Sequence, residues 1–323
     1  MPGRSHPLLT IAIPTWNRAQ DLERCVACLA PQVEIVDRNV EILIADNGST
    51  DATAETIAAL EAPYSFVRHV RNATNVGPDR NYLVLFEQAA GDYVWLLGDD
   101  DFIADGGLRA CLDEIERSQP DLLVTNYEFC NVDRCANSKQ PQIKRCFATD
   151  RHHLDLDALL RIRTHWISCI SCVVYRRELL DIADLSRHAD VYRHWLQVYA
   201  VASTGARSNN ISGISMMAIQ VRTDNNRTPL ASFYREMPRA FAAILRETGV
   251  DENTVRYVEE DILRFALPAR LYVFLRLRQT PDLPDVPLRY KMLYVTCGRA
   301  VIWLWKFYRL CKGRGYSLPE MLL

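Results

Sequence analysis

Three consecutive aspartates, Asp99, Asp100 and Asp101, follow the apolar segment Trp95–Leu97 and a single glycine. Two carboxylates about 5 Å apart repel each other by roughly 3 kcal/mol at an effective dielectric of 20. A partly buried run therefore needs raised pKa values or a bound cation. Oxygen ligands favour Mg²⁺ or Mn²⁺, which complete their coordination with water and substrate phosphate oxygens. The run indicates a divalent metal that neutralises a diphosphate leaving group, with a solvated helix-capping turn as the alternative.

Three further polar segments could take part in the same chemistry. The segment from Asn75 to Asn81 opens a helix, so its N-terminal N–H groups and Arg80 are candidate partners for phosphate, although a plain helix cap explains it equally well. Asp46 could either cap the next helix or accept hydrogen bonds from the edge of a nucleobase. The other two segments are Pro14-Thr15-Trp16-Asn17-Arg18 and Asp46-Asn47-Gly48-Ser49.

The secondary structure around these segments must position them. In the first half of the chain, short apolar runs, typical of strands, alternate with stretches of helical periodicity. This alternation predicts an α/β fold with a Rossmann-like, mostly parallel central sheet flanked by helices. Each polar segment then lies at the carboxyl end of a strand, where open α/β sheets bind their ligands. Asn17 is a candidate N-cap of a helix that begins near Arg18. The predicted strands of the first half are Leu8–Pro14, Val40–Ala45, Phe66–Val70 and Tyr93–Leu97.

The second half of the chain has a looser pattern. It predicts strands over Leu122–Tyr127, Ile167–Tyr175 and Ile214–Val221, with a helix over Tyr192–Ala202. We therefore expect one domain over residues 1–228, made of a first half (1–127) and a second half (128–228). A helical C-terminal region over residues 229–323 follows it.

Composition excludes several classes of protein. The chain has 323 residues, 49% of them apolar, and a net charge of −2, which disfavours both dominant disorder and a nucleic-acid partner. The first residues lack a signal-peptide pattern, so we expect a cytoplasmic protein. Ten cysteines fit small buried side chains better than a zinc site built from two C-x-x-C pairs. The motifs of Rossmann dehydrogenases, P-loop kinases, zincins and serine hydrolases are absent from the sequence.

Taken together, four of these segments resemble family 2 glycosyltransferases of the GT-A fold. The resemblance covers about the first third of the chain, and Trp95 to Asp101 with Arg80-Asn81-Tyr82 is most similar to the abequosyltransferase-like branch of bacterial O-antigen assembly. It implies transfer of a sugar from a nucleotide-diphosphate donor to a saccharide or polyprenyl-linked saccharide acceptor in surface-polysaccharide biosynthesis. It also implies that residues 1–127 form the nucleotide-sugar-binding half of the domain and residues 128–228 the acceptor half. The four segments are Ile13 to Arg18, Ala45 to Asp51, Asn75 to Asn81 and Gly91 to Asp101.

The resemblance also implies roles for individual residues. Thr15, Asn17 and Arg18 would line the nucleotide pocket, Asp46 would contact the base, and Gly77 and Arg80 would lie along the diphosphate and sugar. Asp99 would face the ribose, and Asp99 and Asp101 are the candidate ligands of Mg²⁺ or Mn²⁺. The full candidate donor-binding set is Pro14, Thr15, Asn17, Arg18, Asp46, Asn47, Ser49, Asn75, Gly77, Arg80, Asp99 and Asp100.

The sequence departs from the family pattern at two places. Gly98 occupies the position of the first aspartate in Leu-Asp-x-Asp-Asp, which shifts the aspartate roles by up to one residue. Family 2 enzymes generally invert the anomeric centre, and their general base usually comes from a Glu-Asp pair that this chain lacks in the corresponding region. Asp190 is the best substitute for this base, and Asp184 and His194 are the next candidates. Its alternative role is a negative charge that favours a helix N-terminus.

The C-terminal segment over residues 291–316 mixes aromatic and basic side chains. Arg299 and Lys306 interrupt it, so it should not cross a bilayer but suits a helix in the headgroup layer, which would make the protein peripheral on the inner face of the membrane. Packing on protein, including a second copy in a homo-oligomer, is equally compatible. Two functional alternatives also stay open: a sugar-1-phosphate nucleotidyltransferase, and a non-catalytic nucleotide-sugar-binding protein on the same scaffold.

Overall fold

The computed structural model describes residues 6–36, 39–130, 142–144, 147–222 and 230–262. The chain divides into two compact units, residues 1–227 with 239–259 and residues 228–238 with 260–323. The first unit carries the sheet and the candidate site. The predicted segment 291–316 lies outside the described residues, as does most of the predicted helical region 229–323.

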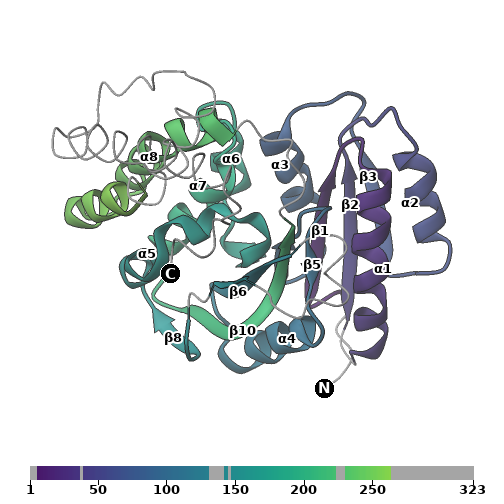
Figure 1. Ribbon diagram of the computed structural model, residues 1–323, viewed down its shortest axis with the longest axis horizontal. Helices are drawn as coiled ribbons and strands as arrows, with labels where there is room; N and C mark the ends of the chain where they lie inside the picture. Colours follow the sequence, from purple (N-terminus) through teal and green to yellow (C-terminus); the bar gives the residue numbers. More distant parts are fainter. Residues whose placement is uncertain (1–5, 37–38, 131–141, 145–146, 223–229, 263–323) are drawn as a thin grey trace, which may run out of the picture. The chain divides into compact units, whose positions relative to one another are not determined.

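One sheet forms the centre of the first unit (Figure 1). The order is β3-β2-β1-β4-β9-β6-β10-β5, with β7 paired to β6 and β8 to β10. Pairs β1–β2, β2–β3, β1–β4 and β6–β10 are parallel, and β9 runs antiparallel between β4 and β6. The bounds are β1 (Leu9–Thr15), β2 (Val40–Asp46), β3 (Val67–Arg71), β4 (Tyr93–Leu96), β5 (Phe102–Ile103), β6 (Leu122–Cys130), β7 (Gln142–Lys144), β8 (Arg151–Leu154), β9 (Val173–Arg176) and β10 (Ile211–Arg222).

Helices cover both faces of this sheet. Figure 1 shows α1 and α2 on one side of the sheet and α3, with α6 and α7, on the other. The continuous apolar runs of β1 and β2 are buried as a result, as expected of parallel strands covered on both faces. The bounds are α1 (Ala19–Ile35), α2 (Thr53–Glu61), α3 (Pro78–Gln88), α4 (Gly107–Ser118), α5 (Leu156–Arg163), α6 (Ile182–His188), α7 (Leu196–Gly205) and α8 (Leu230–Glu247), with 3₁₀ turns at Thr164–Ser168, Ile170–Cys172 and Arg177–Leu179.

The predicted α/β architecture with a mostly parallel sheet is confirmed, but three local predictions are wrong. The first half of the predicted strand Ile167–Tyr175 forms 3₁₀ turns, because its backbone bends to bring Ser171 to the end of β4. The predicted helix Tyr192–Ala202 begins only at Leu196. Asn17 does not cap α1, since its φ is +52° and its side chain accepts a hydrogen bond from the Thr50 N–H at 2.8 Å instead.

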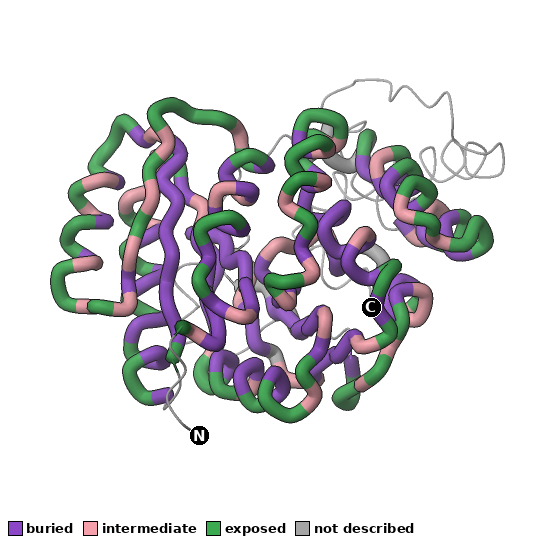
Figure 2. Tube along the Cα trace, turned by 180° about the vertical axis from the view of Figure 1, so that it is seen from behind, coloured by how far each residue is buried: buried purple, intermediate pink, exposed green. Residues whose placement is uncertain are grey.

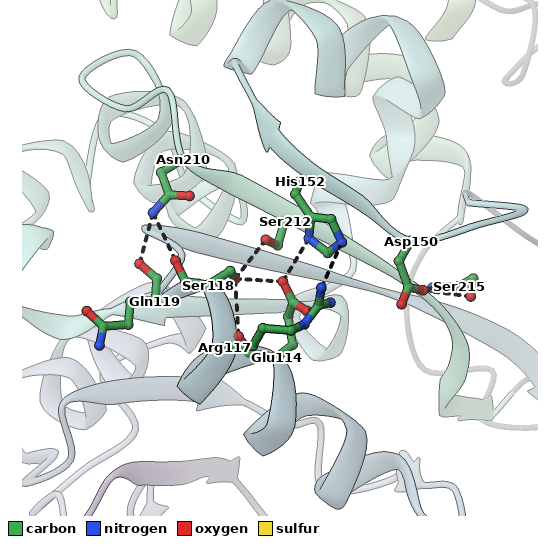
Figure 3. A network of polar contacts seen from close by, with 9 residues as sticks. All are labelled: Glu114, Arg117, Ser118, Gln119, Asp150, His152, Asn210, Ser212 and Ser215. Carbon is green, nitrogen blue, oxygen red and sulfur yellow. Dashed lines mark hydrogen bonds and ion pairs between the residues drawn. The ribbon is translucent and has the colours of Figure 1, made fainter.

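A polar network lies at the amino ends of the parallel strands β6 and β10, at the opposite edge of the sheet from their carboxyl ends (Figure 3). The buried Glu114 carboxylate of α4 accepts hydrogen bonds from the Ser118 hydroxyl at 2.6 Å and contacts His152 Nδ1 of β8 at 3.1 Å. Arg117 pairs with the same carboxylate. Ser118 also lies 3.1 Å from the hydroxyl of Ser212, so the network joins α4, β8 and the start of β10.

Candidate active site

Three strand ends converge at the carboxyl edge of the sheet. The register places Thr15, the last residue of β1, beside Asp46, the last residue of β2, and pairs Ala12 of β1 with Leu96 of β4. The loops that follow these strands therefore meet in space, although 81 residues separate Arg18 from Asp99. Figure 2 shows buried strands that lead to this edge.

Asp99 is a buried carboxylate held by the last residue of β1 and by one residue of the segment that follows β1. Thr15 Oγ1 donates to Asp99 Oδ2 at 2.8 Å, and Arg18 Nη1 donates to Asp99 Oδ1 and to Asp100 Oδ2, each at 2.8 Å. Burial raises the pKa of Asp99 to about 7; Arg18 opposes the shift and the charge of Asp100 adds to it. The guanidinium of Arg18 thus offsets part of the repulsion inside the aspartate run.

Asp101 is also buried, and its partner comes from a distant 3₁₀ turn. The Ser171 hydroxyl donates to Asp101 Oδ2 at 2.6 Å and accepts from the Gly98 N–H at 3.0 Å. The Ser171 carbonyl accepts a further hydrogen bond from Trp95 Nε1 at 2.8 Å. Ser171 therefore fixes both the Asp101 side chain and the end of β4. Sequence reasoning missed this residue, because nothing in its local pattern points to a contact 70 positions away.

Two carboxylates lie against Gly98 so closely that a side chain at this position would crowd them. A Cβ at this position would lie 3.0 Å from Asp101 Oδ2 and 3.1 Å from Asp100 Oδ1. These oxygens are hard ligands, and Mg²⁺ and Mn²⁺ are typically held by one or two carboxylates together with substrate phosphates. The donor set fits such an ion. Both Asp99 oxygens accept hydrogen bonds from Thr15 and Arg18, and Asp101 Oδ2 accepts one from Ser171.

The loop after β2 is held by hydrogen bonds from its own polar residues. Asp46 is almost completely buried; its Oδ1 accepts from the Ser49 N–H at 2.9 Å, and its Oδ2 lies 3.2 Å from Arg71 Nη1. Ser49 Oγ accepts from the Asn17 N–H at 2.8 Å, which joins this loop to the segment after β1. Gly48 has a φ of +70°, and a Cβ there would lie 2.7 Å from the backbone of Thr74, so only glycine fits.

Asparagine side chains shape the loop that precedes α3. Asn47 Nδ2 donates to Asn75 Oδ1 at 3.0 Å and to the Gly77 carbonyl at 3.1 Å, and Asn47 Oδ1 accepts from Asn72 Nδ2 at 3.1 Å. Asn72 also donates to Asn81, which in turn donates to the Ala45 carbonyl of β2. Asn47 and Asn75, predicted to bind the donor, therefore organise the loop that presents Gly77 and Arg80. Asn72 was not identified from the sequence.

The structure brings Asp190 to the start of α3. Arg80 donates to Asp190 through Nε, at 3.3 Å, and through Nη2, which makes a two-point ion pair between residues 110 positions apart. The hydrogen bond from Arg80 lowers the pKa of the Asp190 carboxyl. Asp184 lies elsewhere on α6, where it accepts from Tyr199 and pairs with Arg187.

The remaining sequence-predicted positions are placed by backbone rather than by side chain. Pro14 pairs with Ala45 in the β1–β2 ladder. Gly77 is the N-cap of α3 and has a φ of +86°. His194 is exposed, and its φ is +70°. Within the described ranges, no group of three or more His, Cys, Asp or Glu side chains is placed to hold a metal ion.

This fold and edge define an α/β protein with an acidic site at the carboxyl ends of parallel strands. The model of Glycosyl transferase family 2 matches residues 10–182, and the chain belongs to this family. The predicted family and GT-A fold are thereby confirmed. The chain is 40% identical over 127 residues to abequosyltransferase RfbV of Salmonella typhimurium. That alignment covers 39% of this chain and only 38% of the relative.

Solved structures share the fold. S. aureus TarS 1-349 in complex with UDP-GlcNAc matches with a TM-score of 0.61 at 18% identity, over 85% of this chain and 76% of that chain. The mannosyltransferase PcManGT from Pyrobaculum calidifontis, in complex with GDP-Man and Mn²⁺, matches with a TM-score of 0.55 at 15% identity, over 94% and 82% of the two chains. Among the described helices, none is long and apolar enough to cross a membrane.

Proposed function

We propose that the chain transfers a sugar from a nucleoside-diphosphate donor to a hydroxyl of a saccharide or lipid-linked saccharide in bacterial surface-polysaccharide assembly, with inversion and with a divalent metal. The observation that carries this proposal is the convergence of Thr15, Arg18 and the aspartate run at one edge of the sheet. The similarity to an abequosyltransferase and to structures that hold UDP-GlcNAc or GDP-Man with Mn²⁺ supports it.

The donor would lie along this edge, with its nucleoside near the ends of β1 and β2. The exposed Trp16 side chain, 48% accessible, offers a stacking surface for the base, and the buried Asp46 holds the loop after β2 through Ser49. Arg80 and the N–H groups at the start of α3 would face the diphosphate. The catalytic metal would be held by Asp101 with Asp100 or Asp99, and when bound it neutralises the charge on the leaving diphosphate.

The transfer itself needs one base. The acceptor oxygen forms a bond to the anomeric carbon while the bond from that carbon to the diphosphate oxygen breaks, and the acceptor proton passes to a carboxylate. Asp190 is the candidate base, because it lies beside Arg80 and is exposed to an incoming acceptor. The base therefore comes from the acceptor half of the unit and the donor contacts from the nucleotide half.

The proposal is tested by binding and by chemistry. Calorimetry with UDP, GDP, CDP and dTDP, each with Mn²⁺, should detect metal-assisted binding of at least one nucleotide. Asp101→Asn should then abolish transfer and donor hydrolysis, while Asp105→Asn, an exposed carboxylate just after β5, should leave both unchanged. Absence of binding by all four nucleotides, or a fully active Asp101→Asn variant, would refute the assignment.

A further inference from the structure

The first turn of α3 grips the segment of residues 188–196 at two points. Asp79, which is buried, accepts hydrogen bonds from the backbone N–H groups of His194 at 2.6 Å and of Leu196 at 3.2 Å. The next residue, Arg80, holds Asp190 by its two-point ion pair. Two consecutive residues of the nucleotide half thus hold one short segment of the acceptor half.

The two grips differ in strength. Asp79 makes charge-assisted bonds that satisfy backbone donors at the start of α7, and its side chain is removed from water. Arg80 and Asp190 are both exposed, with 46% and 61% of their side chains accessible. Ion pairs this exposed to water contribute little to stability, because solvent screens the two charges. The Asp79 hydrogen bonds therefore hold residues 188–196 in place even when the ion pair between Arg80 and Asp190 is broken.

Tyr82, in α3, interacts electrostatically with the aspartate run. Burial raises the pKa of the Tyr82 phenol, and the charges of Asp79, Asp99 and Asp100 raise it further. Tyr82 therefore lies within electrostatic reach of both the grip on residues 188–196 and the candidate metal site. Arg80 lies in the first turn of α3, the helix that follows the carboxyl end of β3, and we place the donor diphosphate at that edge of the sheet.

We infer that Arg80 has two partners in turn: it binds Asp190 before the donor binds, and it binds the donor's diphosphate afterwards. Asp79 is a positioning residue that keeps the segment of residues 188–196 in place throughout. The inference rests on the proposed function. It predicts that donor binding releases Asp190 from its ion pair and so makes this carboxylate available to an acceptor hydroxyl.

The exchange is favoured by charge and geometry. A guanidinium binds phosphate oxygens through the same two-point arrangement that it uses for a carboxylate, and a diphosphate carries more negative charge than one aspartate. While Arg80 remains on Asp190, the carboxylate is a poor proton acceptor, because the hydrogen bond stabilises its ionised form. Exchange would therefore couple donor binding to the appearance of a competent base.

A double-mutant cycle on nucleotide affinity tests the exchange without measuring transfer. The probe is Mn²⁺ with the tightest-binding of UDP, GDP, CDP and dTDP, measured by calorimetry. Asp190→Asn should tighten binding by about two- to fivefold, because Arg80 no longer has to leave a carboxylate. In the Arg80→Gln background the same substitution should leave the affinity unchanged.

Each other outcome overturns the inference. Equal tightening in both backgrounds would mean that Asp190 only repels the diphosphate, and no tightening in either would mean that the ion pair does not compete. Circular dichroism and thermal melting of all four proteins establish that they fold, and Arg80→Lys keeps the charge as a further check. If the unchanged chain binds none of the four nucleotides, the proposed function itself is refuted. If the chain binds a nucleotide but Asp190→Asn does not change the affinity, only the inference about Arg80 is refuted.

Discussion

Removal of one buried hydroxyl should weaken both the fold and the metal site. In Ser171→Ala, the Asp101 carboxylate loses a donor at 2.6 Å and the Gly98 N–H loses an acceptor at 3.0 Å. A hydrogen bond to a charged group contributes about 1.5–3 kcal/mol and a neutral one about 0.5–1.5 kcal/mol. The two losses together should lower the free energy of unfolding by about 2–4.5 kcal/mol.

The loss can be measured in two independent ways. For a domain of this size each kcal/mol lowers the melting temperature by about 2–4 °C, so the melting temperature should fall by about 4–18 °C. Nucleoside-diphosphate binding with Mn²⁺ should weaken by about tenfold or more, as is usual when a group that orients a metal ligand is removed. Ser203→Ala is the matched control, since its hydroxyl makes only a 3.4 Å contact within α7.

Two results would refute this reasoning. A melting temperature within about 2 °C of the unchanged protein would mean that the hydroxyl contributes little net stability. A clear thermal loss with unchanged Mn²⁺-dependent binding would mean that Asp101 is not a metal ligand, or that its orientation does not depend on Ser171.

Three further predictions concern other parts of the first unit. Gly48→Ala should lower thermal stability strongly, because the new Cβ would lie 2.7 Å from the Thr74 backbone at a φ of +70°, whereas Gly249→Ala, with a similar φ but open space, should cost only about 1–2 kcal/mol in melting experiments. Asp79→Asn should weaken transfer and shift its pH profile less than Asp79→Ala, since an amide oxygen can still accept one backbone hydrogen bond. Burial lowers the pKa of His188, but the Asp184 carbonyl and Glu247 outweigh it and raise the pKa, so His188→Gln should remove stability that is present below about pH 6.5 and lost as pH rises through the folded value.

The sequence predicts those parts of the fold that repeat a local pattern. The continuous apolar runs of β1 and β2 were placed to within one or two residues, because a buried parallel strand has a strong composition signal. Strands β5 and β7 have two and three residues, too few for any periodicity, and they were missed. The 3₁₀ turn at Ser171 was predicted as strand, because its apolar neighbours satisfy the strand pattern although its hydrogen bonds are long-range.

In the candidate site, likewise, the sequence singles out some residues from their local pattern and does not predict their long-range partners. Arg18, the aspartate run and Asp190 were each found from residue type and position at the end or start of an element. Their partners were not, because the pairing of Asp190 with Arg80 and of Asp79 with the backbone of His194 depends on how distant segments pack. The donor, acceptor and metal roles of these residues stay predictions.

Strand β9 has a consequence for how this architecture can be divided or recombined. It follows β6 in the sequence, yet it lies between β4 and β6 in the sheet and pairs with both. A fragment that ended at residue 127 would leave the edge of β4 open to pairing with other chains. The two parts of the sequence are therefore interlocked, and a chimera of this chain with a relative must keep β9 and exchange only the segments around it.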